Sequence, residues 1–187
     1  MLTFSPLTPD RFSDFEHLFG PRGACAGCWC MFWKLPGKDF RQLSGDGTHQ
    51  MQQSLVDQGL VPGLLAYSDA QPVGWIALEP RSSYPRLARS RVLKPIDSAD
   101  VWSVTCFFTA KSHRRQGITV ELLREAVKFV ALMGGKIVEG YPVEPKSTNA
   151  PAPFVYTGVP TAFLRAGFVE VARFSPVRPI FRYFIKD

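Results

Sequence analysis

A short basic turn at residues 111–119 carries the side chains in this chain that are best suited to binding a charged ligand. It reads KSHRRQGIT, with Arg114 and Arg115 ahead of the glycine Gly117. The apolar run Val101–Thr109 precedes the turn, and an amphipathic stretch that predicts a helix follows it. The first turn of a helix has unpaired backbone N–H groups and a partial positive charge, so it stabilises a phosphate. The turn therefore predicts a site for a phosphate-bearing ligand, with ordinary solvated surface charge as the alternative.

Three of the four cysteines, Cys25, Cys28 and Cys30, lie close together in the sequence. Clustered thiolates hold zinc in many proteins when a fourth ligand is available. However, the chain has no second CxxC pair, and its three histidines are isolated from one another. We therefore favour no metal, and expect free thiols that pack as small hydrophobic groups in a reducing compartment. The fourth cysteine, Cys106, lies in an apolar run and is expected in the core.

The turn at 114–119 also resembles a known sequence motif. The pyrophosphate loop of the GCN5-related N-acetyltransferases, the GNAT family, has Arg or Gln, two residues, Gly, one residue, and then Gly or Ala. Arg114 and Gly117 match this pattern, whereas Thr119 departs from its last position. The resemblance continues through residues 166–168, Ala-Gly-Phe, and covers about Gly63 to the C-terminus. It implies an α/β fold with a mixed, mainly antiparallel sheet, and an enzyme that moves an acetyl group from acetyl-coenzyme A to an amine.

The resemblance also implies which residues hold the coenzyme. The backbone of the strand before the turn would bind the pantetheine arm, and the amides of the turn would cradle the pyrophosphate. Gly117 would let the backbone approach the phosphates closely, with a plain turn glycine as the alternative. The coenzyme-binding residues implied in this way are Phe107, Phe108, Thr109, Arg114, Arg115, Gln116, Gly117, Ile118 and Thr119.

Acyl transfer by direct attack in a ternary complex needs a neutral amine and a proton source for the departing thiolate. Many relatives place a tyrosine four residues before the Gly of Gly-Phe, but this chain has Phe163 there. Tyr141 and Tyr156 are therefore the candidate proton donors. Glu139 lies in the apolar stretch IVEGYPV, where it must find a partner, bind water or have a raised pKa. We favour it over Glu79 as the base, with a salt bridge as the alternative for both.

The elements that must position these residues follow from apolar periodicity and from turn residues. The run Val101–Thr109 is too apolar on both faces for an edge strand, so we expect it at the centre of the sheet. The other predicted strands are Leu2–Leu7, Gly63–Tyr67, Pro72–Leu78, Lys136–Val143, Phe168–Phe174 and Ile180–Ile185, and the predicted helices are Arg11–Phe19, Asp46–Gln58, Val120–Met133 and Thr161–Ala166.

The acceptor is expected to be the amine of a small molecule or a peptide. Basic residues in the long loop Glu79–Asp100 suggest an acceptor with a carboxylate or phosphate, or a contact to the 3′-phosphate of the coenzyme. Aromatic side chains are expected to line its pocket, with plain core packing as the alternative. These side chains are Trp29, Trp33, Phe154 and Tyr156.

Length and composition limit the remaining possibilities. A chain of 187 residues with 45% hydrophobic residues is most simply one domain over 1–187. No apolar run is long enough to span a membrane and no signal peptide is visible, so we expect a cytoplasmic protein. The net charge of +6 is not gathered into one run, so we do not expect nucleic-acid binding. The apolar segment Phe181–Ile185 could support a homodimer.

Two other functions stay open from the sequence. One is a module that binds acyl-coenzyme A without catalysis, which the phenylalanine at Phe163 favours. The other is a basic protein that binds nucleic acid and uses the cysteines as a metal knuckle. The basic patches are short, so we prefer the acetyltransferase.

Overall fold

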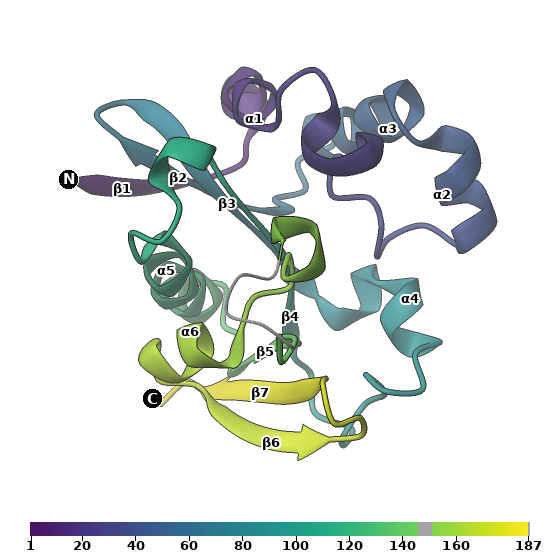
Figure 1. Cartoon of the computed structure of the whole chain (residues 1–187), viewed down its shortest axis with the longest axis vertical. Helices are drawn as coiled ribbons and strands as arrows, with labels where there is room; N and C mark the ends of the chain where they lie inside the picture. Colours follow the sequence, from purple (N-terminus) through teal and green to yellow (C-terminus); the bar gives the residue numbers. More distant parts are fainter. Residues whose placement is uncertain (146–150, 187) are drawn as a thin grey trace.

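A computed structural model of the chain describes residues 1–145 and 151–186. Within these residues the strands form one sheet in the order β1-β2-β3-β4-β5-β7-β6, flanked by helices (Figure 1). The strands are β1 (Leu2–Pro6), β2 (Gly63–Ser68), β3 (Gln71–Pro80), β4 (Trp102–Thr109), β5 (Ile137–Gly140), β6 (Val169–Arg173) and β7 (Pro179–Phe184). The helices are α1 (Phe12–Phe19), α2 (Gly37–Leu43), α3 (Asp46–Asp57), α4 (Pro85–Ala88), α5 (Ile118–Leu132) and α6 (Pro160–Arg165).

Neighbouring strands run antiparallel except β4 and β5, which are parallel. The expected α/β fold with a mixed, mainly antiparallel sheet is therefore confirmed, and β4 lies at its centre as predicted. No helix within the described ranges combines the length and apolarity needed to cross a membrane.

The two faces of the sheet carry separate cores because successive side chains of a strand point to opposite sides. On β2, Leu64 and Ala66 pack in the core that contains α5, whereas Leu65 and Tyr67 pack in the core that contains α1. Figure 1 shows α1 and α5 on either side of β2 and β3. The sheet is thus covered on both faces in this region, which explains why β2 and β3 are almost continuously buried.

The pairing of β4 with β5 is short. It runs from Trp102 opposite Val138 to Val104 opposite Gly140, and β5 ends there. Beyond this point the backbone N–H of Phe107 donates to the carbonyl oxygen of Tyr156, at 2.6 Å. The C-terminal half of β4 therefore faces a loop of the chain instead of a strand, which leaves room for a site beside it.

Several details differ from the sequence-based expectations. The helices α2 and α4 were not predicted, because they are short and lack an apolar stripe of their own. The helix α5 begins at Ile118, two residues before the predicted start at Val120, and Ile118 is buried.

The segment Phe181–Ile185, which was predicted to support a homodimer, is partly buried in the core and partly exposed. Phe181 is only 1% exposed and packs in the core beside α6, whereas Phe184 is 51% exposed. The homodimer stays a prediction, and of these two aromatic residues only Phe184 is available for it.

Candidate active site

A cavity of about 920 Å³ lies beside the C-terminal half of β4 and reaches the start of α5. It brings together residues that are far apart in the sequence: the predicted coenzyme-binding strand and turn, one predicted catalytic tyrosine, and all four cysteines. The predicted site residues among those that line it are Phe107, Phe108, Thr109, Arg114, Arg115, Thr119 and Tyr156.

The turn before α5 has the geometry of a helix start with open amides. Gly117 is the N-terminal cap of α5, with φ 82° and ψ 2°, a left-handed conformation that favours glycine. A Cβ atom at Gly117 would meet no atom of the described residues within 4 Å, so the backbone angle and not crowding accounts for the glycine. The Arg114 Nε donates to the carbonyl oxygen of Thr109 at 3.2 Å, which ties the turn to the end of β4.

The turn residues do not all face the cavity. Ile118 is 3% exposed and packs into the core, where a Cβ atom at Gly74 would lie 2.7 Å from its Cγ2. The Gln116 side chain donates to the carbonyl oxygen of Ser112 at 3.1 Å. Ile118 and Gln116 are thus left with their backbone N–H groups as the means of contacting a ligand, whereas Arg114, Arg115 and Thr119 line the cavity themselves.

Tyr156 lines the same cavity as the helix start. Its backbone carbonyl accepts the hydrogen bond from Phe107, and its ring centroid lies 6.3 Å from that of Phe32. Burial raises the pKa of the Tyr156 hydroxyl above its usual value, so the phenol is neutral at physiological pH. A neutral phenol at this place can donate a proton to a leaving group.

The cysteines form part of the cavity wall. Burial raises the pKa of Cys28 to about 12 and that of Cys30 well above its usual range. The Trp75 indole N–H donates to the Cys30 sulfur at 2.9 Å. Cys106, expected in the core, is half-buried and lines the cavity with them. Among the described residues no group of three or more His, Cys, Asp or Glu side chains is placed to hold a metal ion.

The backbone that presents these thiols is strained. Ala24, Ala26, Trp29 and Cys30 have left-handed φ angles of 67°, 51°, 42° and 61°. Non-glycine residues adopt this conformation rarely, and it persists where the surrounding structure over-determines it, often at ligand sites. Sequence reasoning missed this feature, because alanine, tryptophan and cysteine give no local signal for left-handed backbone.

The predicted aromatic wall is only partly correct. Tyr156 lines the cavity, whereas Trp29 stacks on Phe19 in the core, with ring centroids 5.8 Å apart. Phe154 is 70% exposed, and Trp33 packs in a separate cluster around Tyr84 and Leu87. The aromatic residues that line the cavity beside Tyr156 include Phe32 and Phe40, whose ring centroids lie 5.4 Å apart.

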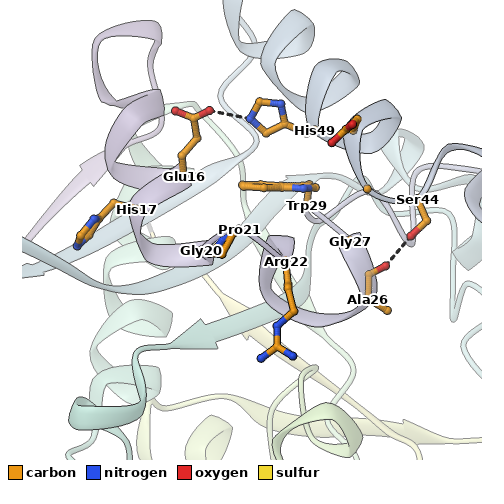
Figure 2. Close-up of a pocket in the computed structure, with 12 residues that line it drawn as sticks. Glu16, His17, Gly20, Pro21, Arg22, Ala26, Gly27, Trp29, Ser44 and His49 are labelled. Atoms are coloured by element: carbon orange, nitrogen blue, oxygen red, sulfur yellow. Dashed lines mark hydrogen bonds and ion pairs between the residues drawn. The ribbon is translucent and has the colours of Figure 1, made fainter.

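Another cavity, of about 980 Å³, lies between α1 and the start of α3 (Figure 2). Its wall includes Glu16 and His49, which form a 2.7 Å pair, and the ring of Trp29 lies beneath them. It contains none of the predicted coenzyme-binding or catalytic residues, although Trp29, predicted for the acceptor pocket, is part of its wall. We therefore place the candidate site in the cavity beside β4, which shares only Ala26 with this one among the described lining residues.

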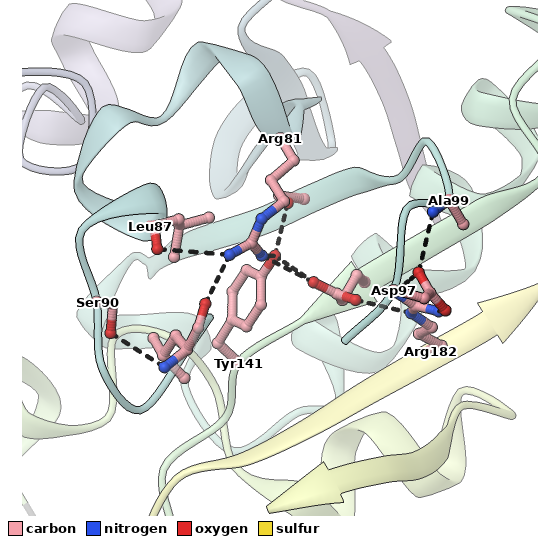
Figure 3. Close-up of polar contacts among 10 residues, drawn as sticks. Arg81, Leu87, Ser90, Asp97, Ala99, Tyr141 and Arg182 are labelled. Atoms are coloured by element: carbon pink, nitrogen blue, oxygen red, sulfur yellow. Dashed lines mark hydrogen bonds and ion pairs between the residues drawn. The ribbon is translucent and has the colours of Figure 1, made fainter. Parts of the chain in front are cut away.

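The predicted base Glu139 lies outside the lining of the β4 cavity, in a buried ion network (Figure 3). It is 1% exposed, and it accepts hydrogen bonds from Arg81 at 2.9 Å and from Arg182 at 2.7 Å. The Tyr141 hydroxyl donates to the same carboxylate at 2.7 Å. Burial raises the pKa of Tyr141 above its usual value. Both candidates thus have their polar atoms engaged within the protein.

The same network anchors the basic loop that was expected to contact a ligand. The Arg81 Nη2 donates to the carbonyl oxygen of Leu93 at 2.6 Å, and Arg182 binds both oxygens of Asp97, at 2.6 and 3.0 Å. Arg81 therefore fastens the loop at 81–97 to β5, and Arg182 fastens it to β7. The alternative base Glu79 is also buried, and it pairs with Lys34 at 2.5 Å. Burial raises the Glu79 pKa, which Lys34 opposes.

Known structures share this architecture. The acetyltransferase of the GNAT family from Listeria monocytogenes aligns with a TM-score of 0.59 at 10% identity, covering 98% of this chain and 95% of that chain. The PaiA N-acetyltransferase from Thermoplasma acidophilum, in complex with coenzyme A, aligns with a TM-score of 0.55 at 13% identity, covering 99% of both chains. An N-acetyltransferase from Staphylococcus aureus aligns with a TM-score of 0.56 at 8% identity, covering 100% and 99%. At these identities the likeness shows the fold.

No curated protein matches the sequence. The family model described as the acetyltransferase (GNAT) family matches residues 29–156, which is more than half of the chain and includes β4, the turn before α5, and Tyr156. The chain therefore belongs to the GNAT family of acetyltransferases.

Proposed function

We propose that the protein transfers an acetyl group from acetyl-coenzyme A to the primary amine of a small-molecule or peptide acceptor, by direct attack in a ternary complex. The observation that carries this proposal is the 2.6 Å hydrogen bond from the Phe107 N–H to the Tyr156 carbonyl. It joins the strand expected to hold the thioester arm to a tyrosine that can donate a proton. Both line one cavity, whose wall also includes Arg114 and Arg115.

The residues at the start of α5 fit a pyrophosphate. The open space before Gly117, the unpaired amides of the first helical turn, and two arginines offer both donors and positive charge. The PaiA enzyme, which has this fold, was solved in complex with coenzyme A, and this supports the choice of ligand. Acetyl-coenzyme A supplies the activated acyl group when bound.

On β4, the Phe107 amide is already engaged by Tyr156. Successive N–H groups of a strand point to opposite sides, so Phe108 turns its amide toward β3. The next residue whose backbone groups point to the cavity side is Thr109. Its carbonyl oxygen accepts a hydrogen bond from Arg114. We therefore assign the main backbone contact of the pantetheine arm to Thr109.

For the chemistry, Tyr156 is assigned as the proton donor to the departing sulfur, because burial keeps its hydroxyl protonated. The described residues that line the cavity include no carboxylate. The acceptor amine therefore loses its proton to water before attack. Glu139 and Tyr141, the other catalytic candidates, are assigned a structural role, since both are held in the ion network.

The test is a Tyr156→Phe variant, which removes the hydroxyl but keeps the backbone carbonyl that binds Phe107. We expect kcat to fall about a hundredfold or more, since general acid catalysis contributes that much. Calorimetric titration should give an unchanged Kd for acetyl-coenzyme A. Tyr183→Phe, on the distant strand β7, serves as the matched control and should keep full activity.

The binding arm of the same experiment uses an Arg114→Ala, Arg115→Ala double variant. It should lose most of its affinity for acetyl-coenzyme A, whereas Lys128→Ala, on the exposed side of α5, should retain it. If the parent protein does not bind acetyl-coenzyme A at all, the proposal is wrong. If Tyr156→Phe keeps full kcat, the assignment of the proton donor is wrong.

One observation favours a second function, the binding of acyl-coenzyme A without catalysis. Phe163, where many relatives carry a tyrosine, is fully buried and packs between Phe107 and Phe168, so no proton donor stands there. A module that binds acyl-coenzyme A without catalysis would need none. Such a module would bind acetyl-coenzyme A in the titration but acetylate no amine in a broad screen.

A further inference from the structure

An arginine with open hydrogen-bond donors lies against two aromatic rings of the β4 cavity wall. The Arg86 guanidinium lies 4.0 Å from the ring centroid of Phe32 and 5.4 Å from that of Phe40, and both rings line the cavity. Its Nε donates to the carbonyl oxygen of Leu35 at 2.6 Å, which fixes the side chain in place. The two terminal nitrogens make no hydrogen bond to the described residues, so both remain available as donors beside these two rings.

No carboxylate of the described residues neutralises this charge. Arg86 forms no ion pair within the described residues, and Arg41 adds a like charge close to it. A Cβ atom at Gly37 would lie 3.7 Å from Arg41 Nη1 and 3.8 Å from Arg86 Nη2, so the two guanidinium groups are neighbours. Burial, together with Arg41, lowers the pKa of Arg86 below its usual value.

A third arginine, Arg178, is close enough to Tyr156 to interact with it electrostatically. The closest polar contact of Arg178 is the Thr157 hydroxyl, 3.4 Å from its Nη1, and burial lowers its pKa. It too makes no ion pair with the described residues. By contrast, other arginines of the chain, such as Arg81, Arg173 and Arg182, do pair with carboxylates. Both Arg86 and Arg178 thus lie near Tyr156 without a carboxylate partner among the described residues.

Partly buried arginines without a counter-charge are costly unless a ligand supplies one. A planar guanidinium with two free terminal nitrogens matches the two oxygens of a carboxylate or phosphate. The cavity wall next to Arg86 is aromatic, with Phe32 and Phe40 in contact with the guanidinium. The centroid of the Phe32 ring is 4.0 Å from the Arg86 guanidinium and 6.3 Å from the centroid of the Tyr156 ring, so Phe32 neighbours both groups.

We propose that Arg86, assisted by the positive charge of Arg41 and Arg178, binds an oxyanion group of the acceptor. The substrate class is then an amine that carries a carboxylate or a phosphate on an apolar, preferably aromatic, body. The amine points toward Tyr156 and the oxyanion toward Arg86. This inference rests on the proposed acetyltransferase function and narrows its acceptor.

The experiment compares three phenethylamines that differ at the para position: the methyl compound, the carboxylate 4-(2-aminoethyl)benzoate, and the phosphate ester of tyramine. Acetyl transfer is measured as kcat/KM with saturating acetyl-coenzyme A. We expect the carboxylate or the phosphate to be preferred over the methyl compound by about tenfold to a hundredfold, as one charged hydrogen-bonded pair provides. A comparison of the two anionic compounds shows whether the site prefers a carboxylate or a phosphate.

In Arg86→Met this preference should disappear through a higher KM for the anionic amine, while kcat/KM for the methyl compound and the Kd for acetyl-coenzyme A stay unchanged. Arg89→Met, an exposed arginine three residues further along the same segment, is the control and should keep the preference. If Arg86→Met does not fold, because its contact with Leu35 is lost, Arg41→Met on the exposed side of α2 should still reduce the preference.

Two results would overturn the inference. One is equal kcat/KM for the three amines in the parent protein, and the other is a preference that survives in both Arg86→Met and Arg41→Met. These results differ from a failure of the proposed function, in which the parent acetylates none of the amines.

Discussion

Burial keeps two thiols of the candidate site, those of Cys28 and Cys30, in their neutral form. Cys28 and Cys30 both have raised pKa values, because the folded chain removes them from water and offers no nearby positive charge that outweighs this. A neutral thiol is a weak nucleophile. The cysteines are therefore suited to shaping an uncharged wall beside Phe108 and not to forming an acyl-cysteine intermediate.

The thiol chemistry can be checked by alkylation. The Cys28 pKa of about 12, against an ordinary value of 9.0, lowers its thiolate fraction at pH 8 about a thousandfold. Because the pKa is raised, reactivity should rise about tenfold per pH unit from pH 7 to 10 without a plateau. Iodoacetamide labelling followed by peptide mass spectrometry should find exposed Cys25 modified long before Cys28. A plateau in the Cys28 rate below pH 10 would contradict this prediction.

Among the secondary-structure elements, α5 connects fold and ligand most directly. Its apolar side packs against β3, and its first turn opens into the β4 cavity. Glycines in left-handed conformation stand at both ends, Gly117 with φ 82° and Gly134 with φ 78°. Neither would place a Cβ atom near the described residues, so the backbone cost of a substitution is similar at the two positions. Only Gly117 stands where phosphates are proposed to bind.

Because Gly117 and Gly134 have similar backbone conformations, alanine substitutions at the two positions form a matched pair of variants. Gly117→Ala and Gly134→Ala should each lower the free energy of unfolding by about 1–2 kcal/mol, the usual penalty of a left-handed non-glycine residue. Only Gly117→Ala should also raise the Kd for acetyl-coenzyme A, measured by calorimetry. Equal affinity in both variants would mean that the ligand does not approach this backbone.

Across the protein, the ion network around Glu139 joins segments from four regions of the chain. Figure 3 shows Arg81, which follows β3, and Arg182, on β7, near Tyr141. Arg81 and Arg182 both donate to Glu139, and Ser103 on β4 shares a hydrogen bond with Tyr141. The loop at 81–97 is fastened to the sheet through these contacts and through Asp97. The network therefore positions α4 and Arg86 beside the cavity without facing the cavity itself.

Replacement of Glu139 tests this structural role. Glu139→Gln leaves two buried arginines without their shared counter-charge, so the free energy of unfolding should fall by about 3–5 kcal/mol in urea titrations. The shape of the pH–rate profile of the remaining folded enzyme should not change. Asp97→Asn, at the exposed end of the network, should cause a smaller loss. If instead the profile loses a limb in Glu139→Gln, the residue acts as a base after all.

Short-range sequence patterns made parts of this structure predictable. Apolar runs bounded by turn residues placed most of the strands to within a few residues, including the two strands of the β2–β3 hairpin. Two arginines, a glycine and an amphipathic stretch identified the helix start at Gly117. Each of these signals depends on neighbours in the sequence, because backbone angles and strand alternation are set by residues a few positions apart.

The composition of the candidate site was predictable only in part, since long-range packing decides which side chains meet. Phe107 and Tyr156 are 49 positions apart, and their contact depends on where the pairing of β4 and β5 ends. The insertion of β7 between β5 and β6 brought Arg182 to Glu139 and so turned a candidate base into an ion-paired residue. No local pattern records such a pairing.

By itself, therefore, the sequence determined the strands, the helix start at Gly117 and the resemblance to an acetyltransferase. Only the tertiary structure decided that the cysteines share a cavity with the phosphate turn, that Glu139 faces two arginines, and that Arg86 faces none of the described carboxylates. The physical reason is that charges and hydrogen bonds act between groups that are close in space. The chain brings such groups together through the packing of a sheet whose strand order departs from the order of the sequence.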